Sequence, residues 1–383
     1  MNALSNWRCA ALKNRIIVSV NAGGYERFEK PVDLFFDFTK SLRQNLDNAP
    51  LTFQIIETDA HGSLSDSQVV WQFTPVNPQF PLAQAHDRLT FLLKGITQPH
   101  QTRTFEIYFD AGSPAPSANP ASRLVSLKDD VMDEEQTCFQ IDTPIGVYYY
   151  QKTAAGFSSI VDRDGSDWIG YHPAGGSAGH YRGIPNLAPY GFHPGYDNSN
   201  SWLIDQGELR VTIFSQNKNQ EAACLWDIFP AYASMTVLSI GERPYWFLYE
   251  GTPGGKFDPE NDYIVHADGR RRSAAESWDE ALPEPEWLYF GSGKTPRVLY
   301  LIHHERDEHT DSYWQMEGNM TVFGFGRAPK GMPLTQYMRA APAHFTIGFV
   351  EENKLEVVTQ AINSAYRDLD ITIRSHDQQS GTL

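Results

Sequence analysis

The sequence predicts an all-β protein in which an N-terminal β-sandwich precedes a larger antiparallel β-domain. Short β-rich segments separated by turn residues recur along most of the chain, and helical periodicity is almost absent. One Pro/Ser/Ala-rich stretch, DAGSPAPSANPASR at 110–123, interrupts this β rhythm. The chain of 383 residues is also long enough for two domains.

The smaller sandwich is expected over residues 1–110, followed by a linker over 111–136. The predicted strands of the sandwich lie at 15–20, 51–57, 69–73, 89–93 and 104–109. The linker joins the Pro-rich stretch to the acidic run KDDVMDEEQ at 128–136, and neither segment offers apolar side chains for a core.

The larger domain is expected over residues 137–350, with a helix and tail over 351–383. Its predicted strands lie at 138–141, 146–152, 157–162, 209–215, 232–240, 245–249, 287–290, 298–303, 320–325 and 344–350. So many strands favour a large sandwich or barrel. Residues 354–367 have helical spacing, and the tail SHDQQSGTL is expected to be disordered.

The amino-acid composition argues against several classes of function. The 31 basic residues against 47 acidic ones give a net charge of −16, which argues against binding nucleic acid or anionic membranes. No apolar run approaches the ~20 residues that span a bilayer. The N-terminus lacks a signal-peptide pattern, so a cytoplasmic location is expected if the chain is complete, and a secreted or periplasmic one if a leader was removed. The sequence leaves the oligomeric state open.

The segment at 171–201 is long, rich in Gly, Tyr and His, and without strand or helix period. Loops of this length inside a compact domain are generally functional or disordered, and its aromatic content favours order. We expect it to form one wall of a site, opposite Glu250 and residues 303–309. Its candidate catalytic residues are His180, Tyr181, Arg182 and His193.

Two further candidates lie on predicted strands. Alternation places Tyr249 with its aromatic neighbours on one face of a strand, and Glu250 on the other face with Trp246. A carboxyl group among aromatic side chains is a plausible acid or base. His303 ends another predicted strand and begins the run HHERDEH.

Aromatic side chains can stack on the C–H faces of sugar rings, while amide, His and Arg groups bind hydroxyls and carboxylates. The sequence therefore indicates a carbohydrate site, and the expected partner is a poly- or oligosaccharide. The candidate substrate-binding residues are Tyr171, Asn186, Tyr196, Trp202, Tyr249, Tyr313 and Trp314.

No cofactor is expected. The three cysteines are far apart and the His spacing matches no closed four-ligand motif, so no structural zinc is predicted. A divalent cation held by the carboxylates and histidines of 303–309 is left open.

Three stretches resemble the galactose-mutarotase-like superfamily. They are GFSSIVD at 156–162, GELRVTI at 207–213, and the paired segments at 230–240 and 245–250. The resemblance implies a large β-supersandwich over 137–350, and a β-sandwich ahead of it is similar to the layout of rhamnogalacturonan-lyase-like proteins. The superfamily includes epimerases, polysaccharide lyases and parts of glycosidases, so it implies a carbohydrate-active protein without choosing the reaction.

The leading hypothesis is a polysaccharide lyase that cleaves a uronic-acid-containing glycan by β-elimination. Arg182 and Asn186 would bind the substrate carboxylate, and His180, Tyr181 or His193 would transfer protons. The alternatives are a glycoside hydrolase with paired carboxylates, or a non-catalytic glycan-binding protein. The hydrolase candidates are Glu250, Glu305, Asp307 and Glu317.

Overall fold

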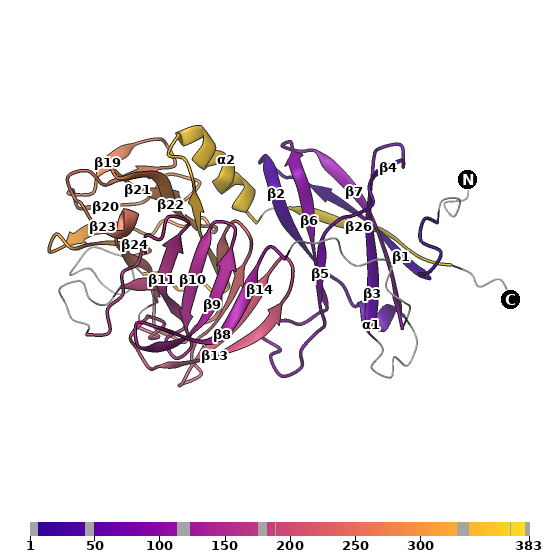
Figure 1. Ribbon diagram of the computed structural model, residues 1–383, viewed down its shortest axis with the longest axis horizontal. Coiled ribbons are helices and arrows are strands. Elements are labelled where there is room, and N and C mark those ends of the chain that lie inside the picture. Colours follow the sequence, from indigo (N-terminus) through magenta and orange to yellow (C-terminus); the bar gives the residue numbers. More distant parts are fainter. Residues whose placement is uncertain are drawn as a thin grey trace. The chain divides into compact units, whose positions relative to one another are not determined.

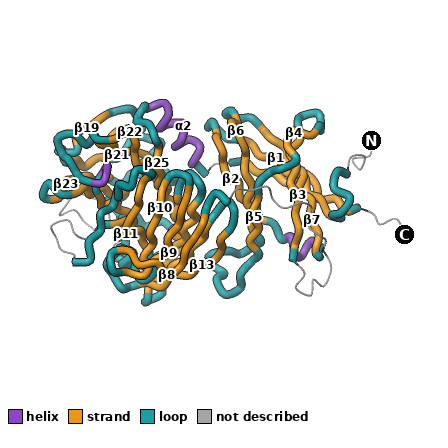
Figure 2. The backbone as a smooth tube through the Cα atoms, in the orientation of Figure 1, coloured by secondary structure: helices purple, strands orange, loops and turns teal. Residues whose placement is uncertain are grey.

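The computed structural model describes residues 7–42, 50–112, 123–174, 182–187, 189–327, 337–367 and 369–379. The protein is nearly all β, with 52% strand and 5% helix, which confirms the predicted fold class (Figure 2). The chain divides into a smaller unit, residues 1–123 with 363–383, and a larger unit, residues 124–362. None of the helices in the described ranges is long and apolar enough to cross a membrane.

The smaller unit contains two antiparallel sheets. Its five-stranded sheet has the order β26 (Asp370–Gln378), β1 (Asn14–Asn21), β7 (Thr102–Ala111), β3 (Leu51–Thr58) and β4 (Leu64–Asp66). Its three-stranded sheet has the order β2 (Arg27–Phe35), β6 (Arg88–Thr97) and β5 (Trp71–Thr74), and the short helix α1 (Phe38–Ser41) follows β2. Alternate residues of β1, namely Ile16, Val18 and Val20, are fully buried in the core.

The C-terminal tail differs from its expected disorder. Residues 375–378 belong to β26, which pairs along the whole of β1 from Asn14↔Gln378 to Asn21↔Asp370. This strand is mostly exposed and polar, so its sequence lacks an apolar alternation. Backbone hydrogen bonds to β1 stabilise it instead, with Ile371 packed against the core.

The larger unit contains two nine-stranded sheets (Figure 1). The first, here called the β17 sheet, has the order β20 (Trp278–Glu280), β23 (Asp311–Met316), β24 (Met320–Phe325), β17 (Phe247–Gly251), β12 (Gly183–Asn186), β11 (Gly156–Asp162), β10 (Gly146–Gln151), β9 (Gln136–Thr143) and β8 (Ser126–Asp133). The second, the β22 sheet, has the order β13 (Ser199–Gln206), β14 (Val211–Asn217), β15 (Ala223–Ile228), β16 (Ala233–Ser239), β25 (Ala343–Val350), β22 (Thr295–His303), β21 (Trp287–Ser292), β18 (Tyr263–His266) and β19 (Arg271–Ser273).

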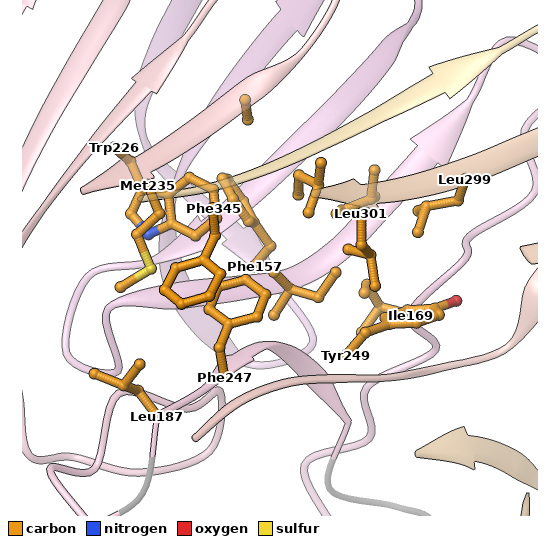
Figure 3. Packing of buried hydrophobic residues seen from close by; sticks show 14 of the residues in the cluster. Phe157, Ile169, Leu187, Trp226, Met235, Phe247, Tyr249, Leu299, Leu301 and Phe345 are labelled. Atoms are coloured by element: carbon orange, nitrogen blue, oxygen red, sulfur yellow. The ribbon is translucent and has the colours of Figure 1, made fainter. Parts of the chain in front are cut away.

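The two sheets enclose one aromatic core (Figure 3). Phe247 of the β17 sheet stacks on Phe345 of the β22 sheet, with ring centroids 4.2 Å apart. Phe157 meets Trp226 edge to face at 4.7 Å. Such pairs add about 0.5–1.5 kcal/mol each beyond the burial of their area. The packed layers hold the strands rigidly, and so fix the side chains on the outer faces.

Four short elements refine the expected boundaries. Strand β8 lies inside the expected linker at 111–136, because Lys128 and its neighbours pair with β9. Strand β12 lies inside the segment at 171–201, which was expected to contain no strand. Only four residues long and containing Pro185, β12 is too short to show a period. A 3₁₀ turn, Pro253–Gly255, follows β17, and the helix α2 (Leu355–Ala365) agrees with the predicted helix.

Candidate functional site

Glu250 lies in the middle of the β17 sheet, between β12 and β24. Its backbone pairs with Gly183 on one side and Val322 on the other. The alternation read from the sequence agrees with the structure: Phe247 and Tyr249 enter the core between the sheets, and Leu248 belongs to a separate apolar cluster. Glu250 therefore projects from the outer face of the sheet, where 11% of its side chain is exposed.

Two side chains hold the Glu250 carboxylate. His193 Nε2 lies 2.6 Å from Glu250 Oε2, and Asn186 Nδ2 donates to the same oxygen at 3.2 Å. His193 Nδ1 faces the carbonyl oxygen of Pro194. Because a carbonyl oxygen can only accept, Nδ1 is the donor there. The other ring nitrogen, Nε2, makes the short contact with Glu250.

The local sequence explains why His193 reaches this position. The backbone N–H of Leu187 donates to the carbonyl of Phe192, which closes a tight turn just before His193. Gly183 has no side chain, and a Cβ there would lie 2.5 Å from the Pro194 ring. Pro194 can therefore pack directly on β12 and bring His193 over Glu250. His193 is only 3% exposed, so its ring is held firmly.

Two arginines of the larger unit lack a carboxylate partner among the described residues, and one of them, Arg327, lies near Glu250. Among the described residues, neither Arg182 nor Arg327 forms an ion pair, although the chain carries a net charge of −16. Burial lowers the pKa of Arg327 to about 10, and the negative charge of Glu250 acts against this shift. Arg327 Nη1 is buried and has no hydrogen-bond partner. Burial also lowers the pKa of Arg182, whose Nε likewise lacks a partner.

Arg182 is positioned by the turn that follows β11. Its Nη1 donates to the carbonyl of Gly170 at 3.1 Å, and the N–H of Gly170 donates to Asp167 Oδ2 at 2.7 Å. Asp167 also accepts the N–H groups of Ile160 and Ile169. Burial is the main reason that the pKa of Asp167 is raised, to about 6. The negative charge of Asp167 favours the charged form of Arg182.

Tryptophan rings adjoin these charges on the same outer face. The Arg327 guanidinium carbon lies 3.6 Å from the Trp314 ring centroid and 5.4 Å from that of Trp246. Both rings pack against the outer cluster of Leu248 with Met320. The face therefore combines a carboxylate, guanidinium groups and aromatic rings.

The other predicted site residues are dispersed. His180 and Tyr181 lie outside the described residues. Tyr196 is 47% exposed, and its ring centroid lies 5.4 Å from that of His193. Trp202 stacks on Phe214, and both residues belong to the β22 sheet, whereas Glu250 belongs to the β17 sheet.

Three tyrosines predicted to bind substrate are core residues instead. Tyr171, Tyr249 and Tyr313 are at most 3% exposed and belong to the cluster between the two sheets. The hydroxyl of Tyr249 donates to the carbonyl of Trp168, and that of Tyr313 donates to the carbonyl of Ala274. The hydroxyls of Tyr249 and Tyr313 are therefore satisfied inside the core, and all three rings pack between the sheets rather than on the outer face that carries Glu250.

His303 belongs to a different group of titratable residues. Its Nδ1 lies 2.7 Å from Glu286 Oε2, and its recorded ion-pair contacts are with Glu286, Glu305 and Asp307. Glu305 in turn contacts His344. Glu286, His303 and Asp307 are also the described residues whose atoms could together hold a metal ion.

Sequence reasoning missed Arg327 and gave no role to Trp246. The alternation of the strand at 245–250 did place Trp246 on the Glu250 face, so a signal existed for it. Arg327 follows β24, and only the pairing of β24 with β17 brings it near Glu250. No local pattern in the sequence indicates that pairing.

Comparison with known proteins gives weak likenesses only. No family model matches the sequence, and no curated protein matches it. A solved structure titled "Crystal Structure Analysis of HI1317" is similar with a TM-score of 0.41 and 12% identity, covering 59% of this chain and 99% of that chain. A galactose mutarotase related enzyme from Lactobacillus acidophilus is similar with a TM-score of 0.38 and 9% identity, covering 57% of this chain and 100% of that chain. These likenesses concern the fold alone and carry no inference about chemistry.

Proposed function

We propose that this protein is a carbohydrate-active enzyme, and that it is a polysaccharide lyase acting on a uronic-acid-containing glycan. One observation carries the proposal: the Glu250 carboxylate is held by His193 and Asn186, and the buried guanidinium group of Arg327 lies near it without an ion-pair partner among the described residues. Buried cationic groups without a protein partner are costly. An anionic substrate would supply the missing partner.

The proposed reaction is a β-elimination. Glu250 removes the proton at C5 of the uronate, the electron pair forms the C4=C5 double bond, and the bond from C4 to the leaving oxygen breaks. The leaving oxygen takes up a proton from an acid, a role for which His180 and Tyr181 stay predictions. Arg182 and Arg327 would neutralise the substrate carboxylate, which makes the C5 proton easier to remove.

His193 acts as a positioning residue rather than as the base. Both of its ring nitrogens are engaged, Nδ1 with the Pro194 carbonyl and Nε2 with Glu250. Its contact with Glu250 fixes the position of the carboxylate. This role differs from the direct proton transfer expected for His193 from the sequence.

The side chains near Glu250 suit an anionic substrate, although the chain carries a net negative charge. The chain as a whole is strongly acidic, yet the residues near Glu250 include Arg327, which lies against two tryptophan rings. Trp314 and Trp246 would stack on sugar rings beside the uronate. A positively charged patch with aromatic rings suits a uronate polymer better than a neutral one.

A hydrolase would need a second carboxylate opposite Glu250. Glu305 contacts histidines, and Asp307 does so as well. Glu317 is exposed in the turn between β23 and β24. We favour the lyase because a buried arginine, Arg327, and two tryptophan rings lie on the same face as Glu250, which suits an anionic sugar.

The test is a screen of polysaccharides, each in native form and with its uronate carboxyl groups reduced to alcohols. The proposal predicts that at least one native uronate polymer releases products with a new ultraviolet absorbance, and that its reduced form is not cleaved. Release of reducing ends without that absorbance would show a hydrolase instead. Binding without any cleavage would show a glycan-binding protein.

A further inference from the structure

A second group of functional side chains lies at the end of β22, away from the recorded contacts of Glu250. The group, here called the Glu286 cluster, consists of Glu286, His303, Asp307 and His309. One potential ligand atom each from Glu286, His303 and Asp307 lie within 4.8 Å of one another. His309 Nδ1 lies 3.2 Å from Asp307 Oδ2.

The fold holds the Glu286 cluster in place before any ligand is bound. Glu286 immediately precedes β21, and the N–H of His303 donates to the Glu286 carbonyl at 3.0 Å. The His303 ring stacks on Phe345, with centroids 4.9 Å apart. The N–H of His309 donates to Asp307 Oδ1 at 2.8 Å, which fixes the loop after β22. Preorganised ligands of this kind favour tight metal binding.

Several carboxylates lie close together in the Glu286 cluster, and a bound cation would neutralise their charge. Glu286, Asp307 and Glu305 all lie within 3.8 Å of a nitrogen of His303. No Lys or Arg forms an ion pair with Glu286 or Asp307 in the described ranges, and only histidines do so. The cluster thus concentrates negative charge in a buried region.

The separations between the donor atoms fit a small ion. Zinc binds nitrogen and oxygen ligands at about 2.0–2.2 Å, so neighbouring ligand atoms in a tetrahedral site stand about 3.4 Å apart. The contacts in the cluster are 2.7 Å from Glu286 Oε2 to His303 Nδ1, and 3.8 Å from His303 Nδ1 to Asp307 Oδ2. The first distance is shorter, and the second longer, than the separation of about 3.4 Å between neighbouring ligand atoms of a tetrahedral zinc site.

We propose that Glu286, His303 and Asp307, with His309 as a fourth ligand, bind one Zn²⁺ ion. The fourth ligand is supported by His309 Nδ1, a buried atom with no hydrogen-bond partner that faces Asp307. Mixed imidazole and carboxylate ligands suit zinc, whereas Mg²⁺ and Ca²⁺ take oxygen ligands. The ion would tie the loop at 304–310 to β21 and β22.

The sequence left open a divalent cation within 303–309, which contains His303, Asp307 and His309, but it did not indicate Glu286 as a ligand. The prediction that no structural zinc is present rested on missing cysteine pairs and on the spacing within 303–309. Glu286 lies 17 residues before His303, and the pairing of β21 with β22 brings the two together.

The test uses the full chain after removal of metal with a chelator. We expect a titration with Zn²⁺ to show one tight site per chain, and zinc in excess to raise the Tm by on the order of 5 °C. Mg²⁺ and Ca²⁺ should have neither effect. Asp307→Asn and Glu286→Gln should each weaken zinc binding at least about tenfold.

His266→Gln is the matched control, because His266 is also fully buried and faces a carboxylate, Glu280, at 3.4 Å. This variant should lose stability but keep the zinc site. Absence of stoichiometric binding would overturn the proposal. Equal zinc affinity in Asp307→Asn, Glu286→Gln and the wild-type chain would overturn it too, because the ion would then bind elsewhere. The readout is binding, so it is independent of any lyase activity.

Discussion

The carboxyl group of Asp167 should make the stability of the larger unit depend on pH in a predictable way. Burial raises the pKa of Asp167 from 3.8 to about 6 in the folded protein. The folded chain therefore binds more protons than the unfolded chain between these values, so the free energy of unfolding falls as the pH rises through this window. The shift is about two pKa units at ~1.4 kcal/mol each, which gives roughly 3 kcal/mol.

The variant Asp167→Asn isolates this contribution because it cannot titrate. It also loses the hydrogen bond that Asp167 Oδ2 accepts from Gly170 N, but that loss is the same at every pH. The stability of the wild-type chain relative to the variant should therefore decrease by roughly 3 kcal/mol between pH 4 and pH 7. Urea unfolding, followed by the fluorescence of the neighbouring Trp168, measures both chains. The reasoning would be refuted if the difference in unfolding free energy between the wild-type chain and Asp167→Asn stayed constant from pH 4 to pH 7, or if the wild-type chain gained stability relative to the variant as the pH rises.

Two further predictions concern packing and charge in the larger unit. Arg297 Nη1 lies 2.8 Å from the buried carboxylate of Asp162, so Arg297→Met should destabilise the chain by about 3 kcal/mol or more in chemical unfolding. The control Arg243→Met removes an exposed ion pair and should change the free energy of unfolding by less than about 1 kcal/mol. Equal losses of stability in Arg297→Met and Arg243→Met would contradict this prediction. A Cβ on Gly251 would lie 2.4 Å from a backbone carbonyl oxygen, so Gly251→Ala should lower stability by about 1–3 kcal/mol. Thermal unfolding measures this variant and its control, Gly241→Ala, which should be nearly neutral because a Cβ on Gly241 has its nearest contact at 3.5 Å. A Gly251→Ala variant as stable as the wild-type chain would show that the strand shifts easily to make room for the Cβ.

The fold class was predictable because its signals are local. Alternation along the strand at 245–250 placed Tyr249 and Glu250 on opposite faces, and the structure shows that the face of Tyr249 is the core face. The pairing of strands is not local, so β12 and β26 were missed. β12 is held by partners on β11 and β17, and β26 by its partner β1.

The candidate site was predictable only in part for the same reason. Residue type and loop character singled out Asn186, His193 and Glu250, which the structure brings together by hydrogen bonds. Aromatic residue type did not separate an exposed ring from a buried one, so Tyr313 was assigned to the site although it lies in the core. Arg327 reaches Glu250 only through the neighbouring strand.

The role of Glu250 is the central claim, and the initial rate of ultraviolet-absorbing product from a cleaved uronate polymer tests it most directly. Glu250→Gln keeps the size of the side chain and its contact with Asn186, but it cannot take up a proton. We expect its turnover to fall by about 10²-fold or more, the usual effect of losing an acid–base group. The exposed Glu276→Gln should leave turnover unchanged. A folded Glu250→Gln protein that forms the unsaturated product at the wild-type rate would contradict the claim.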